Sequence, residues 1–68
     1  MKLKDLIETI NSEIELYHQY EEEPIAVVGF FYRYNEGLIH YLDYEVIGIA
    51  AGTRQGREIL EITVKESN

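Results

Sequence analysis

The chain has 68 residues, of which 13 are acidic, six are basic and none is cysteine, and its formal net charge is −7. A chain of this length holds one hydrophobic core but not two, so we expect a single domain over residues 1–68. The negative charge disfavours direct binding to nucleic acid and to anionic lipid. Because disulfides and thiolate metal sites need cysteine, we expect a homodimer to supply the stability that a small core lacks.

Apolar residues make up 46% of the chain, which is typical of a folded protein and not of a disordered one. The apolar run Ile25–Phe31 has only seven residues, whereas a helix that crosses a bilayer needs about 20. The first residues also lack the apolar stretch of a secretory signal. We therefore expect no transmembrane helix and a cytoplasmic location.

The first predicted element is a short amphipathic helix from Lys2 to Asn11. Its apolar residues follow the i, i+3, i+4, i+7 spacing of one helical face, namely Leu3, Leu6, Ile7 and Ile10. Asn11 and Ser12 tolerate the backbone conformations in which a helix ends. The apolar face of this helix is expected to lie on the core.

Two strands joined by an acidic turn are predicted next. Polar and apolar residues alternate after Ser12, which predicts a strand with one set of side chains facing inward, namely Ile14, Leu16, His18 and Tyr20. Three glutamates and Pro24 interrupt this pattern, because proline cannot donate to a strand ladder. The branched and aromatic run Ile25–Phe31 predicts the return strand of an antiparallel hairpin.

The segment Tyr32–Asp43 is compatible with a hairpin turn or with a short helical turn. Leu38 and Leu42 are four residues apart, and Ile39 lies beside Leu38. This spacing favours a helical turn that places these side chains on the core.

Two further strands are predicted at Tyr44–Ala51 and Ile59–Lys65, and the glycine-bearing segment Gly52–Arg57 connects them. In the second of these strands, alternation predicts that Leu60, Ile62 and Val64 face inward. Taken together, the pattern predicts an α+β domain. An N-terminal amphipathic helix packs on an antiparallel sheet of about four strands, with the short helical turn in the middle of the chain.

The order of these residues resembles a group of short proteins from phages and mobile elements of Gram-positive bacteria. The stretches that carry the resemblance are the opening Lys2–Glu8, Leu42–Val46, Ile49-Ala50 and Leu60–Val64. The resemblance implies an origin of this kind. Size, acidity and the opening helix are also similar in general style to phage-encoded anti-CRISPR proteins, some of which imitate DNA with carboxylates.

Catalytic and metal-binding patterns are not visible in the sequence. Nucleophilic catalysis needs an activated nucleophile with a base beside it, and Ser12 and Ser67 lie at an element end and near the C-terminus. His18, His40 and Asp43 carry metal-binding groups, but their separation matches no short ligand spacing. We therefore expect no enzymatic activity, no metal and no cofactor.

The connection Gly52–Arg57 combines two glycines with Arg54 and Arg57. Glycines let backbone amides approach a ligand and arginines bind phosphate or carboxylate, so this segment is a candidate anion site. The alternative is a solvated hairpin tip whose charges prevent aggregation at a sheet edge.

Two other segments are candidates for binding a protein partner. The acidic run Glu21, Glu22 and Glu23 would attract a basic surface, or simply keep a turn soluble. Six tyrosines and two phenylalanines are too many rings for one small core. Since tyrosine and arginine are enriched in interface hot spots, Tyr32, Arg33 and Tyr34 are predicted to form a contact surface.

These observations predict a small acidic accessory protein that acts by binding a protein, as a phage-type inhibitor of a host defence or nucleic-acid enzyme does. The expected partner is a basic nucleic-acid-binding enzyme, in addition to a second copy of the chain. A nucleotide-binding sponge is one alternative, because arginines and aromatic rings bind phosphates and bases. A phage structural or assembly component is the other.

Overall fold

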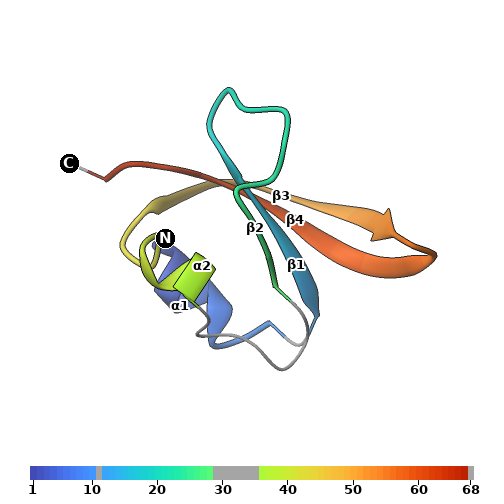
Figure 1. Ribbon diagram of the computed structural model, residues 1–68. Helices are drawn as coiled ribbons and strands as arrows, with labels where there is room; N and C mark the ends of the chain where they lie inside the picture. Colours follow the sequence, from blue (N-terminus) through green and yellow to red (C-terminus); the bar gives the residue numbers. More distant parts are fainter. Residues whose placement is uncertain (11, 29–35, 68) are drawn as a thin grey trace.

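A computed structural model describes residues 1–10, 12–28 and 36–67 (Figure 1). In chain order the elements are helix α1 (Leu3–Ile7), strands β1 (Glu13–His18) and β2 (Ala26–Val28), helix α2 (Glu36–Ile39), and strands β3 (Glu45–Arg54) and β4 (Arg57–Lys65). The fold is α+β, as the sequence predicts. Within the described ranges, no helix has the length and apolar character needed to cross a membrane.

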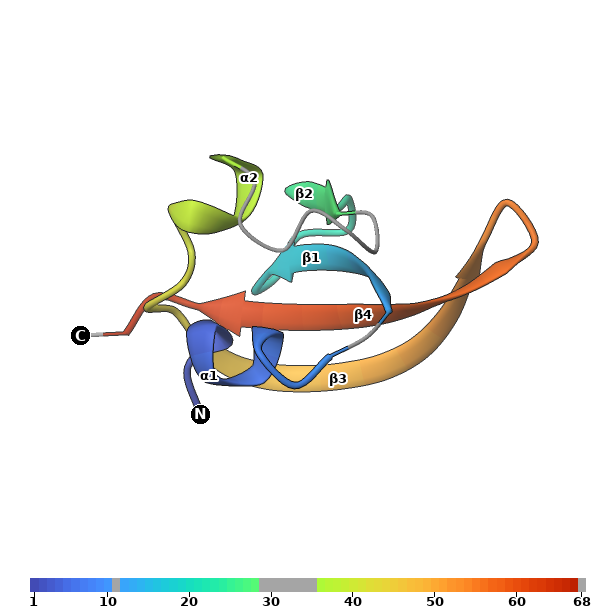
Figure 2. The same ribbon diagram turned by 90° about the horizontal axis from the view of Figure 1, so that it is seen from below.

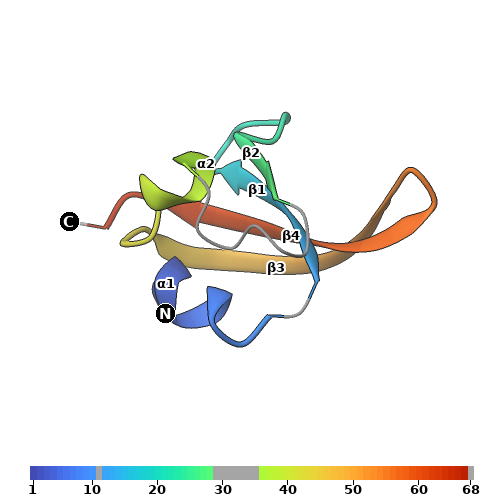
Figure 3. The same ribbon diagram turned by 60° about the horizontal axis from the view of Figure 1, so that its bottom comes forward.

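The four strands form one mixed sheet in the order β2-β1-β4-β3, which Figure 3 shows from the side on which the helices lie. Both predicted hairpins are confirmed, because β1 pairs with β2 and β3 pairs with β4 in antiparallel fashion. The expectation of a fully antiparallel sheet is wrong at the centre, where β1 and β4 run parallel. This register sets Leu16 beside Ile62 and His18 beside Val64, so the apolar residues of both hairpins share one face.

The core lies on that apolar face. Its buried residues come from α1, α2 and the two central strands, together with the residues that flank them: Leu3, Ile7, Ile10, Ile14, Leu16, Leu38, Ile62 and Val64. Figures 1 and 2 show both helices on the same side of the sheet. The predicted alternation in β1 and β4 and the helical spacing of the first segment therefore identify most of the core.

The helical turn predicted in the middle of the chain is present as α2, whose Leu38 is fully buried. Ile39 behaves differently from the expectation, because it points away from the core and is 51% exposed. A helix of four residues buries only one narrow stripe, and the next residue along it is rotated by about 100°, which takes Ile39 out of that stripe. The remainder of the predicted return strand after Val28 lies outside the described residues.

The hairpin of β3 and β4 is longer than the sequence suggests. Its turn consists only of Gln55 and Gly56, with φ angles of 53° and 79°, as in the two-residue turns that match the twist of paired strands. Gly56 adopts this positive φ without strain. Because β1 begins opposite Ile59, the end of the hairpin projects beyond the rest of the sheet (Figure 2).

Candidate functional site

The face of the sheet opposite the core carries a cluster of polar side chains beside the buried Ile59. Strand alternation turns Glu13, Glu15 and Tyr17 of β1 to this face, because their neighbours Ile14 and Leu16 are buried in the core. Glu61 of β4 is in register with Glu15. The hairpin end brings two arginines, Arg54 and Arg57, to the same region.

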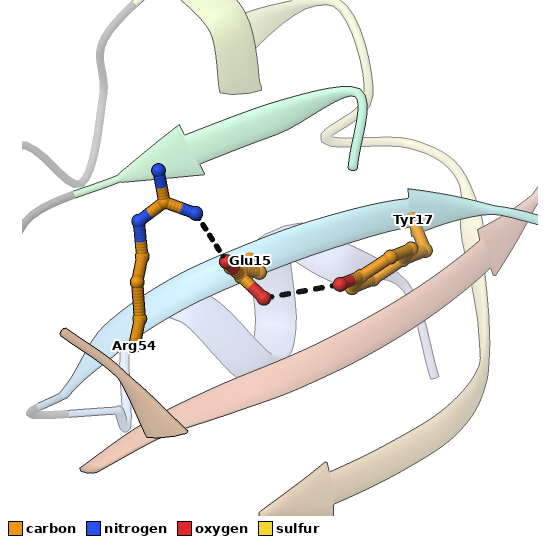
Figure 4. Close-up of polar contacts among 3 residues, drawn as sticks. All are labelled: Glu15, Tyr17 and Arg54. Atoms are coloured by element: carbon orange, nitrogen blue, oxygen red, sulfur yellow. Dashed lines mark hydrogen bonds and ion pairs between the residues drawn. The ribbon is translucent and has the colours of Figure 1, made fainter. Parts of the chain in front are cut away.

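Glu15 is the centre of this polar face and is only 7% exposed. Its Oε2 accepts a hydrogen bond of 2.7 Å from Nη1 of Arg54, and its Oε1 accepts one of 3.0 Å from the hydroxyl of Tyr17 (Figure 4). A buried carboxylate is stable only when such charged and polar partners replace its water. Each oxygen of Glu15 has one.

A second ion pair lies closer to the solvent on the same face. Nη1 of Arg57 lies 2.9 Å from Oε1 of Glu13, and the Arg57 side chain is 67% exposed. Arg54 and Arg57, predicted as an anion site, are therefore each paired with a glutamate of this chain. Any bound phosphate or acidic peptide would compete with these carboxylates.

Gly52 lies within strand β3 and not in a loop as predicted. A Cβ atom at this position would collide with the side chain of Glu61, which lies in the neighbouring strand β4. The glycine therefore leaves room for the Glu61 carboxylate on the polar face.

A hollow of about 550 Å³ lies beside the hairpin. Its lining combines small and aliphatic residues with a few polar ones: Ser12, Ala51, Gly52, Thr53, Glu58, Ile59 and Leu60. Recognition of a nucleotide uses cationic and aromatic groups, and this lining contains neither. The hollow gives no support to the nucleotide-binding alternative.

Burial raises the pKa of Tyr17, and the hydrogen bond to Glu15 and the charges of Glu15 and Glu61 raise it further, while Arg54 lowers it. A tyrosine whose pKa is raised in the folded state stabilises the fold fully below the unfolded pKa, near 10, and this stabilisation is lost as the pH rises through the folded pKa. We expect the free energy of unfolding to fall above about pH 10, and to fall less steeply in Tyr17→Phe.

Urea unfolding followed by circular dichroism at pH 9, 10 and 11 measures this difference. The variant should still lose some stability at alkaline pH, because the pKa of Tyr44 is also raised. Burial is the main cause, and the charges of Glu66 and Tyr41 raise this pKa further. Identical pH profiles for Tyr17→Phe and the unmodified protein would show that Tyr17 does not titrate differently on folding.

The turn between β1 and β2 is exposed to solvent. Tyr20 is 94% exposed and has a φ of 70°, in the left-handed region that bulky residues rarely adopt. Glu21, Glu22 and Glu23 follow it and are all exposed. The predicted inward orientation of Tyr20 is wrong, because β1 ends at His18 and the chain turns at once, with the Glu21 amide donating to the His18 carbonyl at 3.0 Å.

His18 itself is half-buried. Its Nδ1 lies 3.1 Å from the Gln19 carbonyl oxygen, and its ring meets the edge of Tyr44 with centroids 6.1 Å apart. These contacts are typical of a histidine with a structural role, whose ring is held by a hydrogen bond and by packing. Among the described residues, no group of three or more potential ligands is arranged to hold a metal ion.

Of the two predicted partner-binding segments, the structure describes only the acidic run, and its binding role stays a prediction. Tyr32, Arg33 and Tyr34 lie outside the described residues, and their role stays a prediction. Tyr20 was not among the predicted partner-binding residues, although its position directly before the acidic run is the signal that indicates it. No protein-family model, curated protein or solved structure gives a significant match to this chain.

Proposed function

We propose that this protein acts by binding a basic protein partner through the segment Tyr20–Glu23, which we call the acidic turn. In this proposal the partner is a nucleic-acid-binding or defence enzyme of a host cell, the binding is stoichiometric, and the encounter takes place in the cytoplasm. The sheet, with α1 packed on its apolar face, is the scaffold that presents the turn.

The observation that carries the proposal is the combination of a fully exposed ring and unpaired charge at one projecting turn. Within the described part of the chain, no basic side chain pairs with Glu21, Glu22 or Glu23, whereas Glu13 and Glu15 each have an arginine. Unpaired carboxylates attract a basic surface and speed association. An exposed tyrosine supplies the contact area of an interface hot spot.

The backbone of Tyr20 adds to this argument. A left-handed conformation costs an ordinary residue roughly 1–2 kcal/mol, and asparagine or glycine adopts it more easily. The chain nevertheless holds a tyrosine here, with its ring in solvent. Strained residues cluster at binding sites, so the ring is retained at a cost in stability that a binding role explains.

The test of the ring is the substitution Tyr20→Asn, which removes the ring and suits the positive φ. We expect affinity for the partner to fall about 30-fold, a hot-spot effect of about 2 kcal/mol, while the melting temperature stays the same or rises. The partner is first isolated from host extract on the immobilised protein, then purified and titrated by calorimetry. Tyr20→Phe is the control and should bind nearly as well.

The test of the charge compares two triple variants of equal net charge. One replaces Glu21, Glu22 and Glu23 with glutamine, and the other replaces three exposed glutamates elsewhere, namely Glu8, Glu58 and Glu66. The first should slow association about tenfold at low salt, and the second should have little effect. Equal effects of the two triples would mean that only net charge matters, and the acidic turn would then not be the site.

A further inference from the structure

The two edges of the sheet are protected very differently. Within the described residues the β2 edge has three residues, and it follows Pro24 and the acidic turn. Short strands, proline and charge are the usual protection of a sheet edge against pairing with another chain. The β3 edge has ten residues and lacks this protection over most of its length.

The N-terminus covers only the beginning of β3. Lys2 forms an isolated bridge with Glu45, and the amide of Val46 donates to the carbonyl of Met1 at 2.8 Å. From Ile47 onward, no described residue makes a backbone hydrogen bond to the outer edge of the strand. Its outward-facing N–H and C=O groups remain without a strand partner in this part of the structure.

The open stretch Ile47–Thr53 is also uncharged, and it is exposed. Ile49 is 50% exposed, and Ile47, Ala50 and Ala51 are exposed as well. An irregularity in register at Ile47 twists the strand there and ends the regular part of the edge. An open, apolar edge of this length is a template for pairing with a further strand.

We propose that this edge pairs with the same edge of a second copy, so that two four-stranded sheets join across a two-fold axis at Ala50. A closed two-fold dimer requires identical strands to run antiparallel. The open stretch extends three residues to either side of Ala50, which therefore lies opposite Ala50 of the second copy. Gly48 then faces Gly52, and Ile49 faces Ala51.

Charge selects a second copy as the occupant. Two copies that each carry −7 repel over most of their surface, and the uncharged stretch is where they approach at least cost. The stretch is bounded by Glu45 at one end and Arg54 at the other. Within each copy Arg54 is paired with Glu15 and Glu45 with the N-terminal amine. Antiparallel pairing still brings groups of opposite charge together at each end of the stretch, whereas parallel pairing would bring like charges together.

The decisive experiment measures solution mass by light scattering on a sizing column over a concentration series. We expect a mass of twice the 8.0 kDa of one chain. Ile49→Lys should return the mass to that of a monomer, because a lysine on an edge strand opposes pairing. The matched control is Val27→Lys on the opposite edge, where the side chain is 46% exposed, and this variant should remain a dimer.

Cross-linking tests the position of the axis in a chain that has no native cysteine. Ala50→Cys should form a covalent dimer with a short bifunctional maleimide. Thr53→Cys should not, because six residues of strand separate the two equivalent positions by about 20 Å. Circular dichroism and thermal melting confirm that each variant is folded.

A folded protein that stays monomeric at the highest concentration would overturn the proposal, as would a dimer that survives Ile49→Lys or cross-links at Thr53→Cys and not at Ala50→Cys. A monomer that instead takes up an extended peptide at β3 would show that the edge serves another chain. None of these outcomes bears on the acidic turn, because that turn joins the other two strands of the sheet.

Discussion

Replacing Leu38 with alanine is expected to lower the free energy of unfolding by about 2–5 kcal/mol. Leu38 is the residue of α2 that reaches the core, and its side chain is fully buried. Alanine would remove apolar contacts and leave a cavity that the few surrounding residues cannot close. Urea unfolding followed by circular dichroism measures the loss.

The neighbouring residue provides the control. Ile39 lies in the same short helix with half of its side chain exposed, so Ile39→Ala should cost less than about 1 kcal/mol. If Leu38→Ala does not fold, Leu38→Met keeps the volume and should cost less than about 1.5 kcal/mol. Equal losses at the two positions would show that α2 does not contribute Leu38 to the core.

Replacing Glu15 with alanine is expected to lower the free energy of unfolding by about 1–3 kcal/mol. The substitution removes the acceptor of both the Tyr17 hydroxyl and the Arg54 guanidinium. Arg54 is 43% exposed and recovers water, so the loss is smaller than for a pair with both members buried. Glu15→Gln keeps one acceptor oxygen for Arg54, and its amide NH2 can donate to the Tyr17 hydroxyl oxygen, so it should lose less.

Glu13→Ala is the matched control for Glu15→Ala. Glu13 lies in the same strand, on the same face, and is also paired with an arginine, but its pair is more exposed. Exposed ion pairs contribute about 0–1 kcal/mol, so Glu13→Ala should cost less than Glu15→Ala. A double-mutant cycle of Glu15 with Arg54 isolates their coupling, and a coupling near zero would refute the role of this pair.

The sequence predicts well which side of each helix or strand is buried, because buried residues recur at the period of that element. The spacing of Leu3 and Ile7 and the alternation of Ile14, Leu16 and Ile62 identify residues that are buried in the structure. The two hairpins follow in the same way, since each joins adjacent strands through a short connection. The central parallel pair does not follow, because alternation specifies which side of a strand is buried and not which strand lies beside it.

The polar face shows the same limit. Alternation correctly separates Glu15 from Leu16, but it gives no reason for Glu15 to be buried. That burial depends on Arg54, which is 39 residues away along the chain and reaches Glu15 only because β1, β4 and β3 are neighbours in this order. The ion pairs of this face can be predicted from the sequence only after the order of the strands is known.

The parallel pairing of β1 with β4 also has a consequence for how the chain folds. Each hairpin needs only local contacts and can form within microseconds, about 1–10 μs for a typical hairpin. The central pair joins segments as far apart as Glu13 and Ile59, and a loop of that length carries an entropy cost before its contacts are made. We therefore expect the docking of the two hairpins to set the folding rate.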